Sequence, residues 1–447
     1  MVSNYNTFNT SIGRISIEPT LENATAYGGA IPLLDYIERI QLTDDLEEHL
    51  LVSKQGGTFP LNEVATALII GRLLGIERIS HFEEIEEETL LKRFFKWDKL
   101  PDYTTYYNDL QRFENLEDVE GLKETNEELT ERILSKQDHV ILDFDSSVNR
   151  VFGNQEGAEV GYNSMHPGKK SMHPLYVFEG ISRLCLYAEL RNGKAYTSDG
   201  MIEAATEALK HVRSDASIMA RFDKGFPNDA HLCFFEDYRD PDTGFPKEIP
   251  YVGKYKLYKN LVRKGLEKNW CRVYEGTKII EWTEIEHQAQ TWSKPRRIVL
   301  IRMAEASEFD EPYLSEEFIW EYQTLVTNMK DSGDEIWRFY NHRACMENYI
   351  KESKNGFGSD QVSGDDFYAN FADLWLKMMA YNIHILFCKE ICESAHSTYT
   401  IARFRRTFLE IPAKLVTHAR QWKLKLSDTF TKFPDWLKML KRVHQLE

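Results

Sequence analysis

The sequence predicts a mixed α/β protein of two or three domains. Hydrophobic residues recur at helical spacing from Ile31 to about Lys136. From His139 onward, short β-type runs replace the helical period, and a basic segment predicted to be helical ends the chain. At 447 residues and 42% hydrophobic content, the chain is long enough to bury a large core.

Composition and charge restrict the functional classes. The six cysteines form no Cys-x2-Cys pair, which argues against a zinc finger or a disulfide framework and indicates a reducing compartment. The N-terminus has no apolar signal-peptide region, so we expect a cytoplasmic protein with no membrane partner. The net charge is −16, yet eleven Lys or Arg residues oppose four acids from Ser397 onward. Binding to a polyanion must therefore be local.

The first elements are predicted to be helices. Leu33, Leu34 and Ile37 begin the helical pattern, which continues to the end of this region, while residues 1–30 have the composition of a flexible arm. The stretch from Asp102 to Phe113 has capping residues followed by an amphipathic pattern. It is either the second helix of a helix-turn-helix or an ordinary helix of a bundle, and the sequence leaves both open.

The β-type part follows a recognisable order. We expect strands at His139 to Asp145, Leu175 to Phe178 and Leu184 to Leu190, a helix at Gly200 to Val212, and a fourth strand at Ser217 to Asp223. Three strands, a helix and another strand is the order of a ribonuclease-H-like core. A helix near 228–238 and a strand near 249–255 continue it.

Short aromatic-rich β-like pieces interrupt this order between about Val262 and Trp320. A strand at Thr324 to Met329 and a long apolar helix from about Phe367 to Cys388 resume it. The pattern therefore predicts a β-rich insertion within the core.

The stretch from Tyr340 to Lys354 carries the most specific motif. Read as one helix, Tyr340, Arg343, Glu347 and Lys354 fall within about 60° of arc at about 100° per residue. The spacing Tyr-x2-Arg-x3-Glu-x6-Lys resembles the Tyr–Arg–Glu–Lys motif of bacterial insertion-sequence transposases of the DDE type. A glycine pair, Gly356 and Gly358, then ends the helix in the usual way.

The resemblance implies three metal-binding carboxylates, of which Glu347 is the last. Asp143 and Asp145 both lie in the first expected strand, two residues apart, and therefore on one face. Asp145 is favoured as the first carboxylate because Asp145-Ser146-Ser147 resembles the family's pattern, with Asp143 as a supporting residue or a fourth ligand. Asp223 ends the fourth strand in a stretch that resembles the family's Arg-Gly-Asp-Ser-Gly-Phe pattern.

The resemblance also implies the chemistry, the partners and the location that follow. Two Mg²⁺ ions, with Mn²⁺ as a substitute, assist hydrolysis at the ends of the element, and the freed 3′-hydroxyl then attacks target DNA. The partners are double-stranded terminal repeats, target DNA and a second copy of the chain in a synaptic complex, and the location is the bacterial nucleoid. Cut-and-paste through hairpin ends is the expected route. A domesticated DNA-binding protein and a ribonuclease-H-like nuclease without strand transfer are the alternatives.

The domains expected from these patterns are an arm (1–30), a helical end-binding domain (31–136), the core in two parts (137–261 and 323–395), the β-rich insertion (262–322) and a basic helical C-terminal segment (396–447). DNA contacts are expected from the motif and from that segment: Tyr340, Arg343, Lys354, Arg403, Arg405, Arg406, Lys423 and Lys425. Trp282 and Trp292, in the insertion, are either hosts for a base flipped out of a hairpin or core residues of a small β domain.

Overall fold

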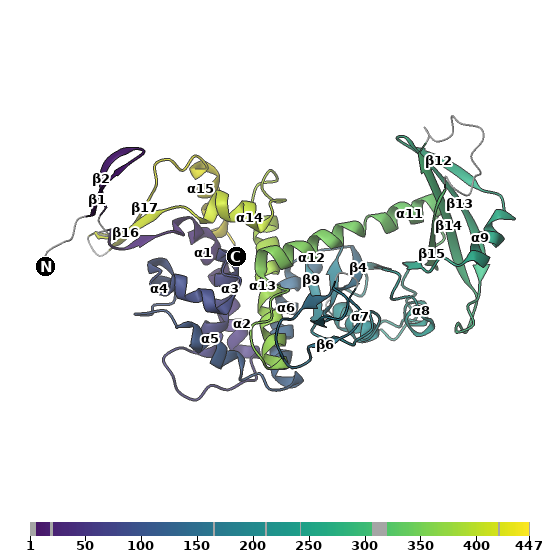
Figure 1. Ribbon diagram of the computed structural model, residues 1–447, viewed down its shortest axis with the longest axis horizontal. Helices are drawn as coiled ribbons and strands as arrows, with labels where there is room; N and C mark the ends of the chain where they lie inside the picture. Colours follow the sequence, from purple (N-terminus) through teal and green to yellow (C-terminus); the bar gives the residue numbers. More distant parts are fainter. Residues whose placement is uncertain are drawn as a thin grey trace.

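The computed structural model describes residues 6–17, 21–163, 166–210, 212–241, 243–305, 320–418 and 421–446. The molecule is elongated, with the N-terminal helices and the C-terminal elements at one end and a group of strands at the other (Figure 1). The long helix α13 (Phe367–Glu390) stands between the N-terminal helices and the central sheet (Figure 1). Among the described residues, no helix has the length and hydropathy that crossing a bilayer requires.

The N-terminal region is helical, as predicted. Asn115 and Asp118 form a capping box at the start of its longest helix, α6, and Asp102 caps α5. Helix α3 is buried on almost every side because α2, α5 and α13 surround it. The elements of this region are η1 (Gly28–Ala30), α1 (Ile31–Arg39), α2 (Leu42–His49), α3 (Leu61–Leu74), η2 (Ile79–Ile85), α4 (Thr89–Phe94), α5 (Tyr103–Leu110) and α6 (Leu116–Leu134).

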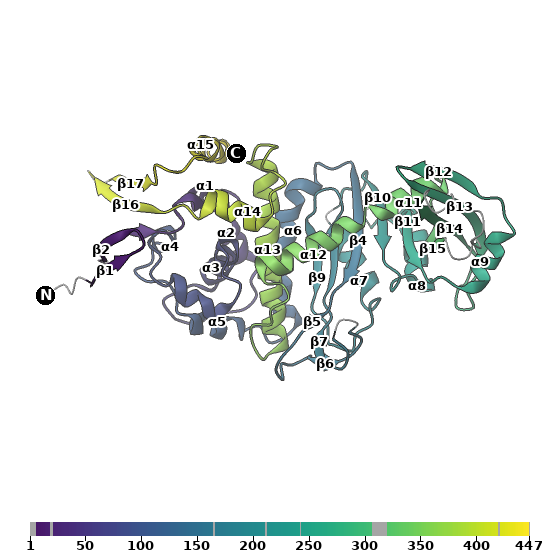
Figure 2. The ribbon, with the colours of Figure 1, turned by 45° about the horizontal axis from the view of Figure 1, so that its top comes forward.

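A nine-stranded sheet forms the centre of the molecule, in the order β12-β13-β14-β15-β11-β10-β4-β8-β9. Strand β10 is parallel to β4 and to β11, and every other neighbouring pair is antiparallel. Figure 2 shows β4, β10 and β11 in succession. The strands are β4 (His139–Ser146), β8 (Leu175–Glu179), β9 (Cys185–Glu189), β10 (Ser217–Phe222), β11 (Tyr251–Tyr255), β12 (Cys271–Glu275), β13 (Lys278–His287), β14 (Arg296–Glu305) and β15 (Glu321–Thr327).

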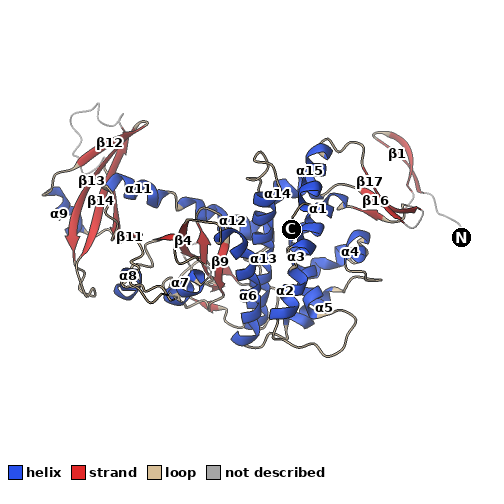
Figure 3. Cartoon of the chain, turned by 180° about the vertical axis from the view of Figure 1, so that it is seen from behind, coloured by secondary structure: helices blue, strands red, loops and turns tan. Residues whose placement is uncertain are grey.

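The expected order of three strands, a helix and a fourth strand is present. Helix α7 (Met201–Leu209) follows β9 and packs on β8 and β9, and α8 (Asp229–Glu236) follows β10. A short three-stranded sheet lies between β4 and β8 in sequence and consists of β5 (Asn149–Arg150), β6 (Glu159–Val160) and β7 (Lys170–Met172). At the far end of the sheet, α9 (Lys259–Leu266) packs on β13 and β14 (Figure 3).

The described strands of the expected insertion do not form a separate sheet. Strand β14 pairs with β15 over seven residue pairs, and β15 pairs in turn with β11 of the central sheet. These strands of the β-rich stretch extend the central sheet, so the interpretation of Trp282 and Trp292 as core residues of a small β domain is corrected. The physical reason is that a strand exposes backbone hydrogen-bonding groups along both of its edges. Strand β15 pairs with β11 along one edge, and β14 pairs with the groups along the other.

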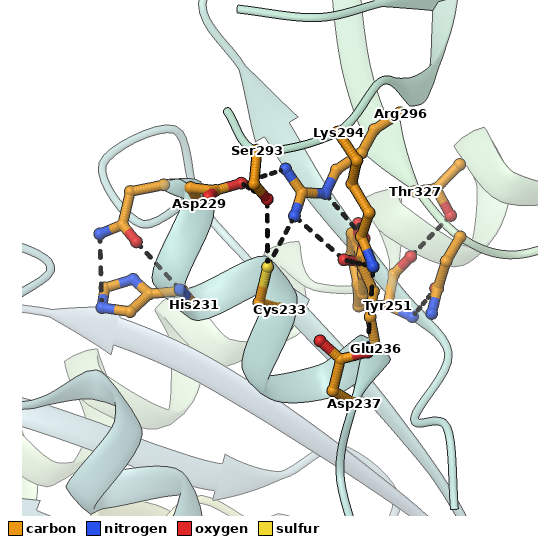
Figure 4. Close-up of polar contacts among 12 residues, drawn as sticks. Asp229, His231, Cys233, Glu236, Asp237, Tyr251, Ser293, Lys294, Arg296 and Thr327 are labelled. Carbon is orange, nitrogen blue, oxygen red and sulfur yellow. Dashed lines mark hydrogen bonds and ion pairs between the residues drawn. The ribbon is translucent and has the colours of Figure 1, made fainter. Parts of the chain in front are cut away.

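A polar cluster fastens α8 to the extension (Figure 4). The Arg296 guanidinium donates to Asp229 at 2.7 Å and to both oxygens of Glu236 at 2.7 and 3.0 Å. The Tyr251 hydroxyl donates to Glu236 at 2.7 Å. Side chains from α8, β11 and β14 thus satisfy one another, which fixes the helix that follows Asp223.

The N-terminal arm and the C-terminal segment differ from their predictions. Residues 6–17 form a hairpin of β1 (Asn6–Thr10) and β2 (Gly13–Ile17), and β3 (Ala24–Thr25) pairs with β16 (Ala413–His418). Residues 1–5 and 18–20 of the expected arm lie outside the described part of the chain. Strand pairing explains the difference. Strands β1 and β2 pair with each other, whereas β3 pairs with β16, which is distant in sequence.

The C-terminal segment is only partly helical. It contains α14 (Ile401–Phe404), the π-helical turn η4 (Arg405–Leu409), the hairpin of β16 with β17 (Gln421–Leu426), and α15 (Phe433–Val443). The prediction of an all-helical segment was wrong, because the dense positive charge of the segment does not distinguish a helix from a strand and the spacing of its apolar residues does. Trp422, Leu424 and Leu426 alternate with polar residues, which is a strand pattern.

Candidate active site

Two carboxylates meet at the ends of two adjacent parallel strands. Asp145 lies near the end of β4, and Asp223 follows β10 directly; in the pairing of these strands, Phe144 is opposite Phe222. Burial raises the pKa of Asp145 to about 6; Arg343 opposes this shift, and the nearby charge of Asp223 adds to it. A buried carboxyl with a second carboxylate beside it is typical of a catalytic or metal-binding site.

The motif helix lies over this pair. The Tyr340 hydroxyl donates to Asp223 Oδ1 at 3.3 Å, and Arg343 Nη2 lies 3.1 Å from Asp145 Oδ2. Arg343 also donates to the carbonyl of Phe144 at 3.0 Å. The Tyr340 hydroxyl thus contacts one carboxylate of the pair, and the Arg343 guanidinium contacts the other.

The predicted single helix is two helices. Helix α11 (Gly333–Asn341) ends before His342, and α12 (Ala344–Phe357) begins after Arg343, although both run in nearly the same direction (Figure 1). The Arg343 backbone N–H donates to the carbonyl of Tyr340, three residues back, which is the pattern of a tightened turn. This tightened turn coincides with the contacts that hold the buried Arg343 side chain on Asp145 and Phe144. As predicted, α12 ends at glycine, with Gly358 at φ 69°.

Glu347 lies apart from the carboxylate pair. It is in the first turn of α12, and its side chain is exposed. Within the described ranges, no three acidic, His or Cys residues gather as metal ligands. Asp145 and Asp223 supply the oxygen donors that a hard divalent cation prefers, so these two fit such an ion, and Glu347 is not grouped with them among the described residues.

Asp143 is engaged elsewhere. Both of its oxygens accept hydrogen bonds from Arg221, at 2.7 and 2.6 Å, and the two side chains are 1% and 3% exposed. Arg221 also donates to the carbonyl of Phe339 at 2.9 Å in α11. The expectation of Asp143 as a fourth ligand is corrected, because a bidentate ion pair between β4 and β10 already satisfies it.

Arg221 was missed as the partner of Asp143, although the sequence contains a signal. Asp143 precedes Asp145 by two residues, and Arg221 precedes Asp223 by two residues. On adjacent parallel strands, residues at matching offsets stand opposite each other, and Asp143 is paired with Arg221 in the sheet.

The basic residues expected to contact DNA divide into two groups. Lys354 donates to the carbonyl of Val148 at 3.3 Å, and burial lowers its pKa. Arg405 is buried, its guanidinium donates to the carbonyls of Leu73 and Gly356 at 2.7 and 2.5 Å, and burial lowers its pKa to about 10. Arg405 is therefore a structural residue, and its assignment to DNA is corrected. The exposed residues are Arg403, Arg406, Lys423 and Lys425.

The two tryptophans of the extension both pack against neighbours. Trp292 is 5% exposed and lies 5.1 Å from the ring of Tyr255, centroid to centroid. Trp282 is half-buried against α11, where a Cβ on Gly333 would come within 2.4 Å of its ring. Neither ring has a fully open face for a base in this structure.

Comparison with a family of known proteins agrees with this class of site. The family model described as "Transposase DDE domain group 1" matches residues 12–447. Among solved structures, the chain is similar to the piggyBac transposase in a synaptic complex with hairpin DNA, with 11% identity, coverage of 84% of this chain and 79% of that one, and a TM-score of 0.45. No curated protein matches. The chain belongs to the group 1 DDE transposase family.

Proposed function

We propose that the chain binds the ends of its own insertion sequence, cleaves them by phosphodiester hydrolysis and joins the 3′-hydroxyl ends to target DNA. The observation that carries this proposal is the pair of Asp145 and Asp223 at adjacent strand ends, under Tyr340 and Arg343. Family membership supports the class of reaction. A ribonuclease-H-like core, synapsis as a homodimer and hairpin ends belong to the same proposal.

Asp145 and Asp223 would hold divalent metal, with Glu347 as the third carboxylate from α12. Mg²⁺ supplies a Lewis acid that activates the attacking oxygen and stabilises the leaving oxygen of a phosphodiester. Arg343 lies beside the carboxylate pair, buried and bound to Asp145 and to the carbonyl of Phe144, so it would reach a DNA phosphate only by exchanging these partners. The exposure of Glu347 is the one observation that favours the alternative of a DNA-binding protein without cleavage.

A strand-transfer assay tests the proposal. Labelled DNA that carries the inverted repeats flanking the gene is incubated with the protein, Mg²⁺ and a supercoiled target plasmid. We expect cleavage at the repeat boundary and joining of pre-cut ends to the plasmid. Cleavage without joining would identify a nuclease, and end binding without cleavage would identify a domesticated binding protein.

The exposed lysines of β17 should contribute affinity for DNA that does not depend on sequence. Lys423 and Lys425 are both exposed on this strand. Replacing both by Ala should lower the slope of log K against log salt by about 0.9 for each DNA phosphate that the variant no longer binds. Fluorescence anisotropy with a labelled duplex over a series of salt concentrations measures the slope.

The matched control is Lys210→Ala, at the C-terminal cap of α7, where Lys210 is paired with Glu207 at 2.6 Å. An unchanged slope in the double variant, equal to that of the control, would assign β17 to solubility and not to DNA.

A further inference from the structure

A cavity of about 810 Å³ lies at the end of β4. Ser146 and Ser147, the residues that follow Asp145, form part of its wall, and Lys354 of α12 lines it too. Arg78 and Tyr107 of the N-terminal helical region complete it from the other side. The cavity thus begins one residue from the candidate carboxylate and joins two regions that are distant in sequence.

The charge of this wall is opposite to that of the whole protein. Its basic residues are Arg78, Arg150 and Lys354, and Asp360 is its one acidic residue. The chain as a whole carries a net charge of −16. A positive cavity in an acidic protein focuses anions, and a phosphate group is such an anion.

An exposed aromatic residue stands in the same wall. Phe152 is 84% exposed, and the Arg150 guanidinium lies 4.4 Å from its ring centroid. An open ring backed by a guanidinium is a platform on which nucleic acid bases stack. The hydrophobic core does not explain why a large apolar side chain stands at position 152, because Phe152 is exposed and packs against little of the chain.

Buried polar atoms in the wall have no hydrogen-bond partner among the described residues. They are Arg150 Nε, Gln155 Oε1 and Asn163 Nδ2, and Asn163 is only 5% exposed. Such groups are costly unless something satisfies them. Donors and acceptors of this kind match the edges and phosphates of nucleotides.

We propose that this cavity holds an unpaired nucleotide of the DNA strand next to the scissile bond, with its phosphate on Arg78, Arg150 and Lys354 and its base stacked on Phe152. The inference deepens the proposed function and rests on it. The volume lies in the range of pockets for small ligands, so it suits an unpaired nucleotide and not a duplex. This subsite lies at β5 and is separate from Trp282 and Trp292 of the extension.

The test measures binding without cleavage. The probe is a short fluorescein-labelled oligothymidylate, titrated with the full chain in EDTA and followed by anisotropy. We expect Phe152→Ala to weaken binding by about 5- to 150-fold, because the base loses the aromatic ring on which it stacks. Phe152→Trp should bind as the wild type does, since the ring face is kept. Arg150→Gln should lower the salt slope by about 0.7.

The matched control is Phe245→Ala, because Phe245 is also exposed, at 72%, and does not line this cavity. Equal binding by Phe152→Ala and wild type would overturn the inference, as would equal losses in Phe152→Ala and Phe245→Ala. Loss of dimer in sedimentation with oligonucleotide binding intact would also overturn it and assign Phe152 to a second copy of the chain.

The readout separates this subsite from the proposed function. Phe152-dependent oligonucleotide binding by a chain that never cleaves or joins DNA would refute the transposition proposal alone. Normal cleavage and joining with binding that ignores Phe152 would refute the subsite alone.

Discussion

Asp145→Asn and Asp223→Asn should each lower the rate of DNA-end cleavage by more than about 100-fold, because a ligand to a catalytic metal contributes several kcal/mol to the stabilisation of transition-state charge. Asn keeps the size of Asp and its ability to accept from Arg343 or Tyr340, so the fold and end binding should persist. Cleavage of labelled repeat ends in Mg²⁺ measures the rate, and a gel-shift assay measures end binding.

Asp215→Asn is the matched control, because Asp215 lies on the turn before β10 and is exposed in an ion pair with Arg213. Its cleavage rate should equal that of the wild type. Cleavage within tenfold of wild type for either Asp145→Asn or Asp223→Asn would remove that residue from the site.

Glu347→Gln tests whether the third carboxylate joins the pair during the reaction. If Glu347 is a ligand, the effect of its replacement should match those of Asp145 and Asp223, although it is exposed and apart from them in this structure. A wild-type rate for Glu347→Gln would leave a site of two carboxylates.

Much of the central sheet follows from local sequence. The apolar runs at β4 and β10 each end in an aspartate, and both strands appear where the period changes from helical to alternating. The position of Asp223 beside Asp145 follows from strand ends meeting at one edge of a parallel pair. The capped helix α6 and the glycine that ends α12 are equally local features.

Interactions between distant segments account for what the sequence did not reveal. The contacts of Arg405 with carbonyls of α3 and α12 depend on a helix packing that no local window contains. The break at Arg343 has the same origin, since Asp145 lies on another element. The strand β17 is different, because apolar and polar residues alternate within its own six residues, which is a local signal for a strand.

A buried charge cluster holds α3 to α13 and supports the second large effect that we expect. Asp373 accepts from Lys377 at 2.7 Å and Arg72 at 3.1 Å, and it also accepts from Ser363. The side chains of Arg72, Asp373 and Lys377 are at most 1% exposed. One carboxylate therefore serves two buried cations.

Asp373→Asn should lower the free energy of unfolding by about 3–5 kcal/mol at pH 7, because it leaves both cations buried without a counter-charge. Urea unfolding followed by circular dichroism measures the change. Asp365→Asn, a neighbouring exposed carboxyl, is the matched control and should change stability by no more than about 0.5 kcal/mol. A decrease below about 1 kcal/mol in Asp373→Asn would show that water or rearrangement relieves the two cations.

The pH dependence of stability should identify the same carboxylate. Burial raises the pKa of Asp373, but the charges of Lys377 and Arg72 outweigh burial and lower it from the ordinary 3.8 to about 2. A carboxyl whose pKa is lower in the folded state stabilises the fold above its unfolded pKa, and the stabilisation is lost as the pH falls through the folded value. Between about pH 5 and pH 2, the wild type should therefore lose about 2 kcal/mol through this group, and Asp373→Asn should lack that part of the loss. Parallel curves for the two proteins would show that Asp373 is not the titrating group.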